Sequence, residues 1–219
     1  MIQAVLFDLD GTFADTAPDL GYAVNQMRIA RGLAPVPDEK TRPVTSSGAR
    51  GLLSAGFGIT PDHADYPAMR DEFLAIYEAN LCRETRLFGG MEQLIDALES
   101  LGLIWGIVTN KAERFALPLM KLLGYSKRAA CIIGGDTTGK TKPHPEPLFA
   151  AARAIHIAPA DCIYVGDDER DIQAGRAAGM KTVAVRYGYL NGGDPASWGA
   201  DAVIDAAIDM LQFITPSRE

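Results

Sequence analysis

The sequence predicts an α/β fold: a Rossmann-like parallel sheet with helices on both faces, and a small helical domain inserted after the first strand. Two observations support this prediction. Short apolar runs alternate with amphipathic helical segments over the last two thirds of the chain. Between residues 16 and 83, apolar residues recur at helical spacing and no strand pattern appears. We therefore expect a core of residues 1–15 and 84–219 and an inserted helical domain of residues 16–83.

The first strand is expected at residues 2–9, an apolar run that ends in carboxylates and then Gly11. The inserted domain begins with Thr16, since Pro18 and Asp19 are typical of a first helical turn. Gly32 ends that helix. A short helix follows Ser46 or Ser47, either of which is suited to cap it, and another runs from Met69 to about Leu81.

After Gly89 and Gly90 the pattern becomes a regular alternation of helix and strand, which is typical of a parallel sheet. Glycines end several of the predicted helices, as C-terminal capping residues commonly do. The expected helices cover residues 91–101, 114–123, 147–155, 172–178 and 206–213, and the expected strands cover 103–109, 131–133, 162–165, 182–185 and 202–204.

Composition and charge exclude several classes of protein. The 28 acidic residues outnumber the 21 basic ones, giving a net charge of −7, and no block of Lys and Arg occurs. Such a chain is poorly suited to bind nucleic acid or anionic lipid, so we expect neither partner. No apolar run approaches the roughly 18–20 residues that cross a bilayer. The first residues lack the basic start of a signal peptide, and we expect a cytoplasmic protein.

The three cysteines, Cys82, Cys131 and Cys162, are widely spaced and form no C-x-x-C pair. This spacing lacks the pattern of a zinc site or a disulfide framework. We expect three buried, reduced thiols.

Polar residues cluster where the predicted strands end, and ligands of open parallel sheets bind at that edge. The first strand is not followed by a G-x-G-x-x-G loop, which removes the main support for a dinucleotide site. Carboxylates gathered at one edge favour a hard cation such as Mg²⁺, and a nearby hydroxyl and ammonium would suit a phosphate. Asp8, Asp10, Gly11 and Thr12 lie at the end of the first strand, and Thr109 and Asn110 lie at the end of the second. Gly166, Asp167 and Asp171 lie at and beyond the end of a later strand, and Lys142 lies before a helix.

Each of these residues also has an ordinary structural interpretation when it is taken alone. Asp8 is suited to cap a helix, and Thr109 is a common β-branched strand residue. Lys142 is suited to a solvated surface, and Asp168 and Glu169 to the first turn of a helix. Their joint order along the chain is what favours a functional site.

That order resembles the four motifs of the haloacid dehalogenase (HAD) superfamily: Asp8-x-Asp10-Gly11-Thr12, then Thr109, then Lys142-Pro143, then Gly166-Asp167-x-x-x-Asp171. The resemblance covers essentially the whole chain, and residues 16–83 look like the small helical cap of that superfamily. It implies a HAD core with an inserted cap domain.

The resemblance also implies a role for each matching residue. Asp8 matches the nucleophile that forms an aspartyl-phosphate, and Asp10 matches the general acid and base, a carboxyl that must hold a proton and whose neighbour Asp8 favours that state. Mg²⁺ would bind the Asp8 carboxylate, the Asp10 backbone carbonyl and the Asp167 carboxylate, with support from Asp171. Thr109 and Lys142 would bind the phosphoryl oxygens.

Asp10 argues against one other activity of the superfamily, and two further alternatives remain. True dehalogenases lack the second aspartate, which here is Asp10. A phosphosugar mutase would keep all four motifs and shield its phospho-enzyme from water. A non-catalytic binding or scaffold protein of HAD fold would be expected to lose Asp8 or Asp10, and both are present.

Several stretches resemble bacterial phosphoglycolate phosphatases, among them residues 108–111 and 142–145. The segment 45–50 is more similar to N-acetylmuramic acid 6-phosphate phosphatases. The resemblance therefore implies a small-molecule phosphate ester as substrate, 2-phosphoglycolate or else N-acetylmuramic acid 6-phosphate, in a monomer or a homodimer. Each ester carries a carboxylate, for which Arg50 or Arg42 is a suitable partner. Asn110, Ser46 and Ser47 are further candidates to bind the substrate.

Overall fold

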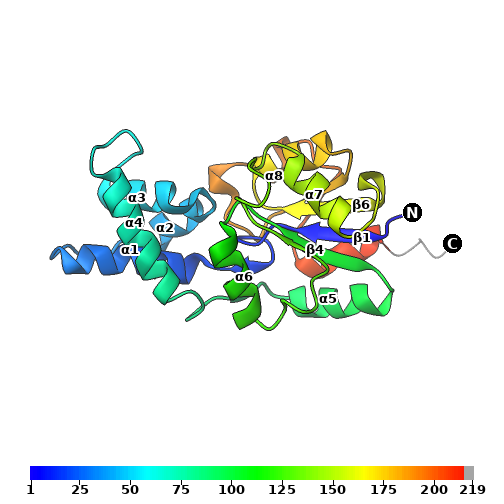
Figure 1. Ribbon diagram of the computed structural model, residues 1–219, viewed down its shortest axis with the longest axis horizontal. Helices are drawn as coiled ribbons and strands as arrows, with labels where there is room; N and C mark the ends of the chain where they lie inside the picture. Colours follow the sequence, from blue (N-terminus) through cyan, green and yellow to red (C-terminus); the bar gives the residue numbers. More distant parts are fainter. Residues whose placement is uncertain (215–219) are drawn as a thin grey trace.

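The computed structural model describes residues 1–214 and contains a six-stranded sheet with a helical block beside it (Figure 1). The strand order is β5-β4-β1-β6-β7-β8, and all neighbouring strands are parallel. The predicted α/β fold class is therefore confirmed. The strands are β1 (Ala4–Phe7), β4 (Ile104–Val108), β5 (Ile132–Ile133), β6 (Cys162–Gly166), β7 (Lys181–Val185) and β8 (Ala202–Ile204).

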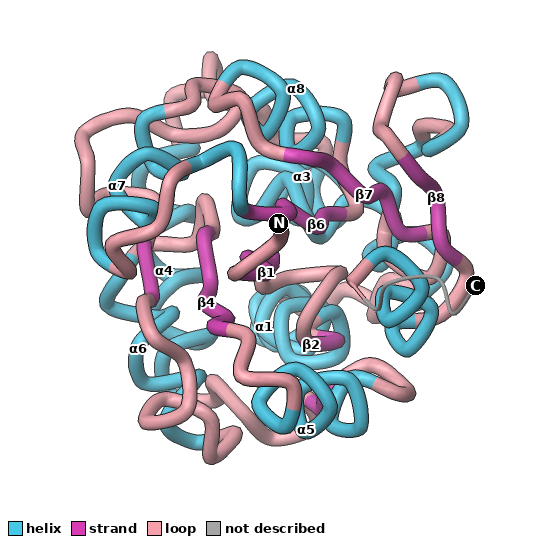
Figure 2. The backbone as a smooth tube through the Cα atoms, turned by 90° about the vertical axis from the view of Figure 1, so that its right-hand side faces the viewer, coloured by secondary structure: helices cyan, strands magenta, loops and turns pink. Residues whose placement is uncertain are grey.

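Strand β1 is fully buried because both faces of the sheet are covered. Val5 and Phe7 belong to one hydrophobic core, and Ala4 and Leu6 belong to a second. Figure 2 shows helices on both sides of the sheet. Apolar side chains of α5 (Met91–Ser100), α6 (Glu113–Leu122) and the 3₁₀ helix η5 (Ala207–Phe213) join the first core, and those of α7 (Glu146–Ala154) and α8 (Glu169–Ala177) join the second.

The helical block lies beyond one end of the sheet (Figure 1). Its helices pack on one another through fully buried side chains such as Met27, Leu52 and Phe73, which continue the first core. Its elements are α1 (Ala17–Ala30), α2 (Asp38–Thr41), the 3₁₀ helix η1 (Arg42–Ser47), α3 (Gly48–Phe57) and α4 (Tyr66–Ala79).

The chain leaves and re-enters the sheet region through a small antiparallel ribbon, β2 (Ala14–Asp15) with β3 (Arg86–Leu87). The sequence analysis missed this ribbon, since two residues carry no periodicity. Asp19, expected to interact with a helix dipole, is fully buried and holds the return segment instead. Its carboxylate accepts hydrogen bonds from the backbone N–H groups of Glu84 and Thr85 and from Oγ1 of Thr85 at 2.7 Å.

Several details correct the sequence-based expectations. The last predicted helix is the 3₁₀ helix η5, and α8 begins at Glu169, three residues earlier than expected, because Asp168 caps it. All three cysteines are free, but Cys82 is only half-buried. The predicted core extends to residue 219, of which residues 215–219 lie outside the described part. Within residues 1–214, no helix has both the length and the apolar character needed to cross a membrane.

Candidate active site

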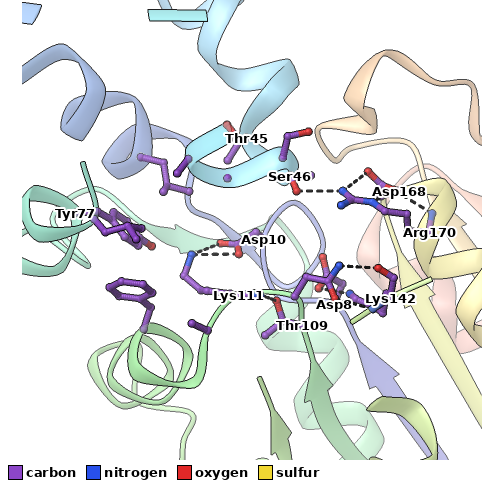
Figure 3. A pocket seen from close by; sticks show the side chains of 18 of the residues that line it. Asp8, Asp10, Thr45, Ser46, Tyr77, Thr109, Lys111, Lys142, Asp168 and Arg170 are labelled. Atoms are coloured by element: carbon purple, nitrogen blue, oxygen red, sulfur yellow. Dashed lines mark hydrogen bonds and ion pairs between the residues drawn. The ribbon is translucent and has the colours of Figure 1, made fainter. Parts of the chain in front are cut away.

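Three neighbouring strands, β4, β1 and β6, end at one edge of the sheet, as the sequence analysis expected. Asp8 follows β1, Thr109 follows β4 and Asp167 follows β6. A cavity of about 320 Å³ lies between this edge and the helical block (Figure 3). Of the residues predicted for the site, the cavity is lined by Asp8, Asp10, Ser46, Ser47, Thr109, Asn110, Lys142 and Asp171.

Lys142 is buried and lines the cavity, and four acceptor atoms lie close to its ammonium. Nζ lies 2.7 Å from Oδ1 of Asp8 and 2.7 Å from Oδ1 of Asp171. It also donates to the Tyr164 hydroxyl at 2.8 Å and to the Val108 carbonyl at 3.1 Å. Burial by itself lowers the pKa of Lys142, but the two carboxylates more than offset this effect and raise it. Lys142 is therefore a fixed cation beside Asp8.

Asp8, Asp167 and Asp171 form a buried acidic cluster, with one ligand oxygen from each within 4.8 Å of the others. Burial raises the pKa of Asp8 to about 7, although Lys142 lowers it in part. Burial and the charge of Asp8 hold the pKa of Asp167 well above its usual range. Carboxylates at such short range repel one another unless a cation neutralises them, so this cluster could hold a divalent metal ion.

Two glycines let the backbone pack directly against the Asp167 side chain. A Cβ at Gly11, where φ is +89°, would lie 2.2 Å from Oδ2 of Asp167, and one at Gly188 would lie 2.2 Å from its Cβ. The backbone N–H of Tyr189 donates to Oδ2 at 2.8 Å, and Oγ1 of Thr12 donates to Oδ1 at 3.2 Å. These contacts aim the carboxylate at the acidic cluster.

The Asp10 carboxylate faces away from that cluster, toward the helical block. Nζ of Lys111 lies 2.9 Å from its Oδ1 and 3.1 Å from its Oδ2, and Oγ1 of Thr16 donates to Oδ1 at 2.5 Å. The sequence analysis did not assign Lys111 to the site. The one feature that pointed to it was its place, two residues after Thr109 in the loop that follows β4.

Thr109 and Asn110 contribute in different ways. Oγ1 of Thr109 accepts the backbone N–H of Lys111 at 3.1 Å. The Asn110 side chain binds the backbone of Lys142 on both sides, accepting from its N–H at 2.9 Å and donating to its carbonyl at 3.0 Å. Asn110 therefore fixes the loop that carries the buried ammonium.

The segment that contains Ser46 and Ser47 connects the helical block to the sheet edge. Ser47 precedes α3 but makes no capping hydrogen bond, so the interpretation of the serines as helix caps is wrong for its side chain. Its hydroxyl donates to Oδ1 of Asn191 at 3.2 Å, and that of Ser46 donates to Oδ2 of Asp167 at 3.4 Å. Arg170, paired with Asp168, donates to the Ser46 carbonyl at 3.1 Å (Figure 3).

The two arginines expected near a substrate carboxylate lie elsewhere. Arg50 is exposed on α3 and does not line the cavity. Arg42 pairs with Asp15 at 3.0 Å. The arginines that line the cavity are Arg114, at the start of α6, and Arg170. Sequence spacing could not identify Arg114, because α6 and the helical block meet only in the folded chain.

The chain is similar to known proteins over most of its length. A family model described as haloacid dehalogenase-like hydrolase matches residues 5–185. The chain is 44% identical over 214 residues to the N-acetylmuramic acid 6-phosphate phosphatase of Pseudomonas aeruginosa, covering 97% of this chain and 95% of that protein. It is 48% identical over 204 residues to the phosphoglycolate phosphatase of Xanthomonas campestris pv. campestris, covering 93% of this chain and 92% of that one.

Among solved structures, one from Haemophilus somnus 129PT, described as a predicted phosphoglycolate phosphatase, is similar with a TM-score of 0.87 and 25% identity. The match covers 98% of each chain. The similarity therefore includes the helical block as well as the sheet.

Proposed function

The chain belongs to the haloacid dehalogenase-like hydrolase family, and we propose that it is a Mg²⁺-dependent phosphomonoester hydrolase that acts through an aspartyl-phosphate on Asp8. One observation carries the proposal: the buried cluster of Asp8, Asp167 and Asp171, with the Lys142 ammonium 2.7 Å from Asp8. A divalent cation and an ammonium beside one carboxylate form a binding place for a phosphoryl group.

Asp8 is suited to attack phosphorus. Lys142 contacts its Oδ1, while Oδ2 accepts no hydrogen bond from the described residues. In the first step this oxygen forms a bond to phosphorus as the ester P–O bond breaks, and Asp10 gives a proton to the leaving alkoxide. In the second step Asp10 takes a proton from water, which attacks phosphorus and releases inorganic phosphate and the free Asp8 carboxylate.

The acidic cluster fits Mg²⁺ through its oxygen ligands. Asp8 and Asp167 would hold the ion through their carboxylates and Asp10 through its backbone carbonyl, with Asp171 in support. Mg²⁺ neutralises the negative charge of the phosphoryl group and of the carboxylates around it. Thr109 and Lys142 would bind the remaining phosphoryl oxygens.

We infer that residues 16–83 form a cap domain over a core of residues 1–15 and 84–219. The cavity lies between the two parts, and residues of both parts line it. A cap in this position excludes water from the phosphoryl group and supplies the contacts that select the alcohol part of the ester. The cytoplasmic location expected from the sequence stays a prediction.

The names of the relatives suggest two substrates, 2-phosphoglycolate and N-acetylmuramic acid 6-phosphate. Both carry a carboxylate as well as a phosphate, and Arg114 is the proposed partner of that carboxylate in place of Arg50. The cavity also has an apolar wall that contains Leu20, Phe73 and Phe115. That wall and the cavity volume favour the larger ester, whose ring and methyl groups have apolar surface to bury.

The test is phosphate release, with Mg²⁺, from both esters and from common sugar phosphates. A kcat/KM for one ester roughly a hundredfold above the rest, or about 2.7 kcal/mol of discrimination, would identify the substrate. The variant Asp8→Asn and an EDTA-treated sample should both be inactive. A flat, low profile would favour a mutase or another ester. No release from any ester by the folded protein would overturn the proposal and favour a non-catalytic role.

A further inference from the structure

Tyr77 on α4 carries a buried hydroxyl with no hydrogen-bond partner among residues 1–214. Its side chain is 1% exposed and lines the cavity. Burying a hydroxyl without a partner costs free energy, and native structures rarely leave such a group unpaired. The unpaired hydroxyl therefore indicates that another molecule pairs with it when the cavity is in use.

The ring of Tyr77 is held in position from two sides. Nζ of Lys111 lies 4.7 Å from the ring centroid, and the ring of Phe115 packs against it at 5.7 Å. Figure 3 shows the hydroxyl directed toward the cavity on the side of Lys111. No hydrogen bond of acceptable geometry joins the two groups, and the ammonium bonds to Asp10 instead. Burial raises the pKa of Tyr77 to about 12, so the hydroxyl keeps its proton and can donate it to a hydrogen bond.

The position of Tyr77 relative to the proposed chemistry shows which part of a substrate it would meet. Asp8 and Lys142 mark the phosphoryl end of the cavity. Asp10, the proposed donor of a proton to the leaving oxygen, lies on the side of the helical block, and Lys111 connects it to Tyr77. We therefore expect the atoms attached to the leaving oxygen to lie near the Tyr77 hydroxyl.

We propose that the Tyr77 hydroxyl donates a hydrogen bond to an oxygen on the alcohol part of the substrate, near the ester oxygen. It thereby selects esters that carry an oxygen there over plain alkyl phosphates. An ester without that oxygen leaves the Tyr77 hydroxyl unpaired in a site closed to water. Its transition state is therefore bound more weakly, and its kcat/KM is lower. This inference rests on the proposed phosphatase function.

The test compares the wild type with Tyr77→Phe, which removes one oxygen and keeps the ring. We expect kcat/KM to fall roughly 10- to 100-fold for the ester that the wild type prefers in the panel. For ethyl phosphate, which has no second oxygen on its alcohol part, we expect a change of less than about threefold. The melting temperature of the free protein should be unchanged or higher, since the lost hydroxyl has no partner to lose.

Tyr125→Phe is the matched control, because the Tyr125 hydroxyl contacts Glu92 at 3.4 Å and does not line the cavity. This variant should leave kcat/KM unchanged for both the preferred ester and ethyl phosphate. If ethyl phosphate reacts too slowly, its inhibition constant against the preferred ester gives the same comparison. An equal loss for both esters, or no loss for either, overturns the role of Tyr77. Absence of all phosphate release by the wild type would instead overturn the proposed function itself.

Discussion

The ammonium of Lys111 lies 2.9 Å from one carboxylate oxygen of Asp10 and 3.1 Å from the other, in a pair that is almost closed to solvent. Their side chains are 6% and 14% exposed. A cation in this place fixes the orientation of the Asp10 carboxylate through two hydrogen bonds. Lys111 is thus a positioning residue for the proposed general acid, and it contacts Tyr77 of the helical block as well.

Lys111→Met should destabilise the protein by about 2–4 kcal/mol, because it leaves the Asp10 carboxylate buried without its partner. Unfolding in urea measures this change. The double variant Lys111→Met with Asp10→Asn should recover much of the loss, since it removes both charges. Equal stability of the single and the double variant would contradict the pairing.

Lys111→Met should also lower kcat about 10- to 100-fold, with a smaller change in KM, because a misplaced general acid affects mainly the transition state. Steady-state kinetics on the preferred ester measure the two constants separately. The pH profile of kcat should shift as well, a change that a purely structural role would not produce. A variant that raises KM alone would assign Lys111 to substrate binding instead.

Lys142→Arg should inactivate the enzyme although the charge is kept. Four acceptors surround Nζ between 2.7 and 3.1 Å, and a planar guanidinium with fixed donor directions does not fit that arrangement. We expect kcat to fall roughly 100-fold or more. The buried Lys142 should be compared with the exposed Lys140, where Lys140→Arg should have no effect. A kcat for Lys142→Arg within threefold of the wild type would contradict this account.

The sequence predicted those features of the site that depend on strand order alone. Asp8 and Thr109 lie at the ends of predicted strands and Asp167 lies just beyond another, and parallel neighbours bring such residues to one edge. Lys142 was found by its place in the motif order, although it sits in a loop.

Features that depend on packing between distant segments could not be predicted from the sequence. Lys111 gains its place only because Asp10 and Tyr77, 101 and 34 positions away, converge on it. Arg50 was expected in the cavity as a cationic partner for a substrate carboxylate, but its place on α3 leaves it exposed to solvent. Ser47 is placed as a helix cap, yet its hydroxyl donates across the cavity edge to the 3₁₀ helix η3 (Leu190–Gly192).

The metal-free protein should be less stable at pH 8 than at pH 6, on account of Asp8. Burial raises the pKa of this carboxyl from 3.8 to about 7, so the folded state binds the proton more tightly than the unfolded state. The free energy of unfolding therefore falls as the pH rises from about 4 to about 7. Outside this range the contribution of Asp8 does not change with pH. Thermal unfolding in EDTA measures the trend, and Asp8→Asn should reduce it.

Mg²⁺ should raise the melting temperature more at pH 8 than at pH 6. The ion would bind the deprotonated carboxylates and offset their mutual repulsion, so its effect would grow as the cluster loses protons. Thermal unfolding with and without Mg²⁺ at both pH values measures the difference. Asp167→Asn should abolish most of the Mg²⁺ effect while the protein still folds. An equal increase at both pH values would argue against binding at this cluster.

Arg114→Ala should raise the KM for a carboxylate-bearing ester about 10- to 100-fold, because a hydrogen bond to a charged group contributes about 1.5–3 kcal/mol. Arg114 lines the cavity, and its guanidinium lies over the Phe115 ring, 4.5 Å from the ring centroid. Arg50→Ala is the matched control, since Arg50 is exposed on α3 and outside the cavity, and its KM should stay within about twofold of the wild type. Ethyl phosphate, which lacks the carboxylate, should respond to neither change. A larger effect of Arg50→Ala than of Arg114→Ala would mean that the helical block moves Arg50 to the substrate when the ester binds.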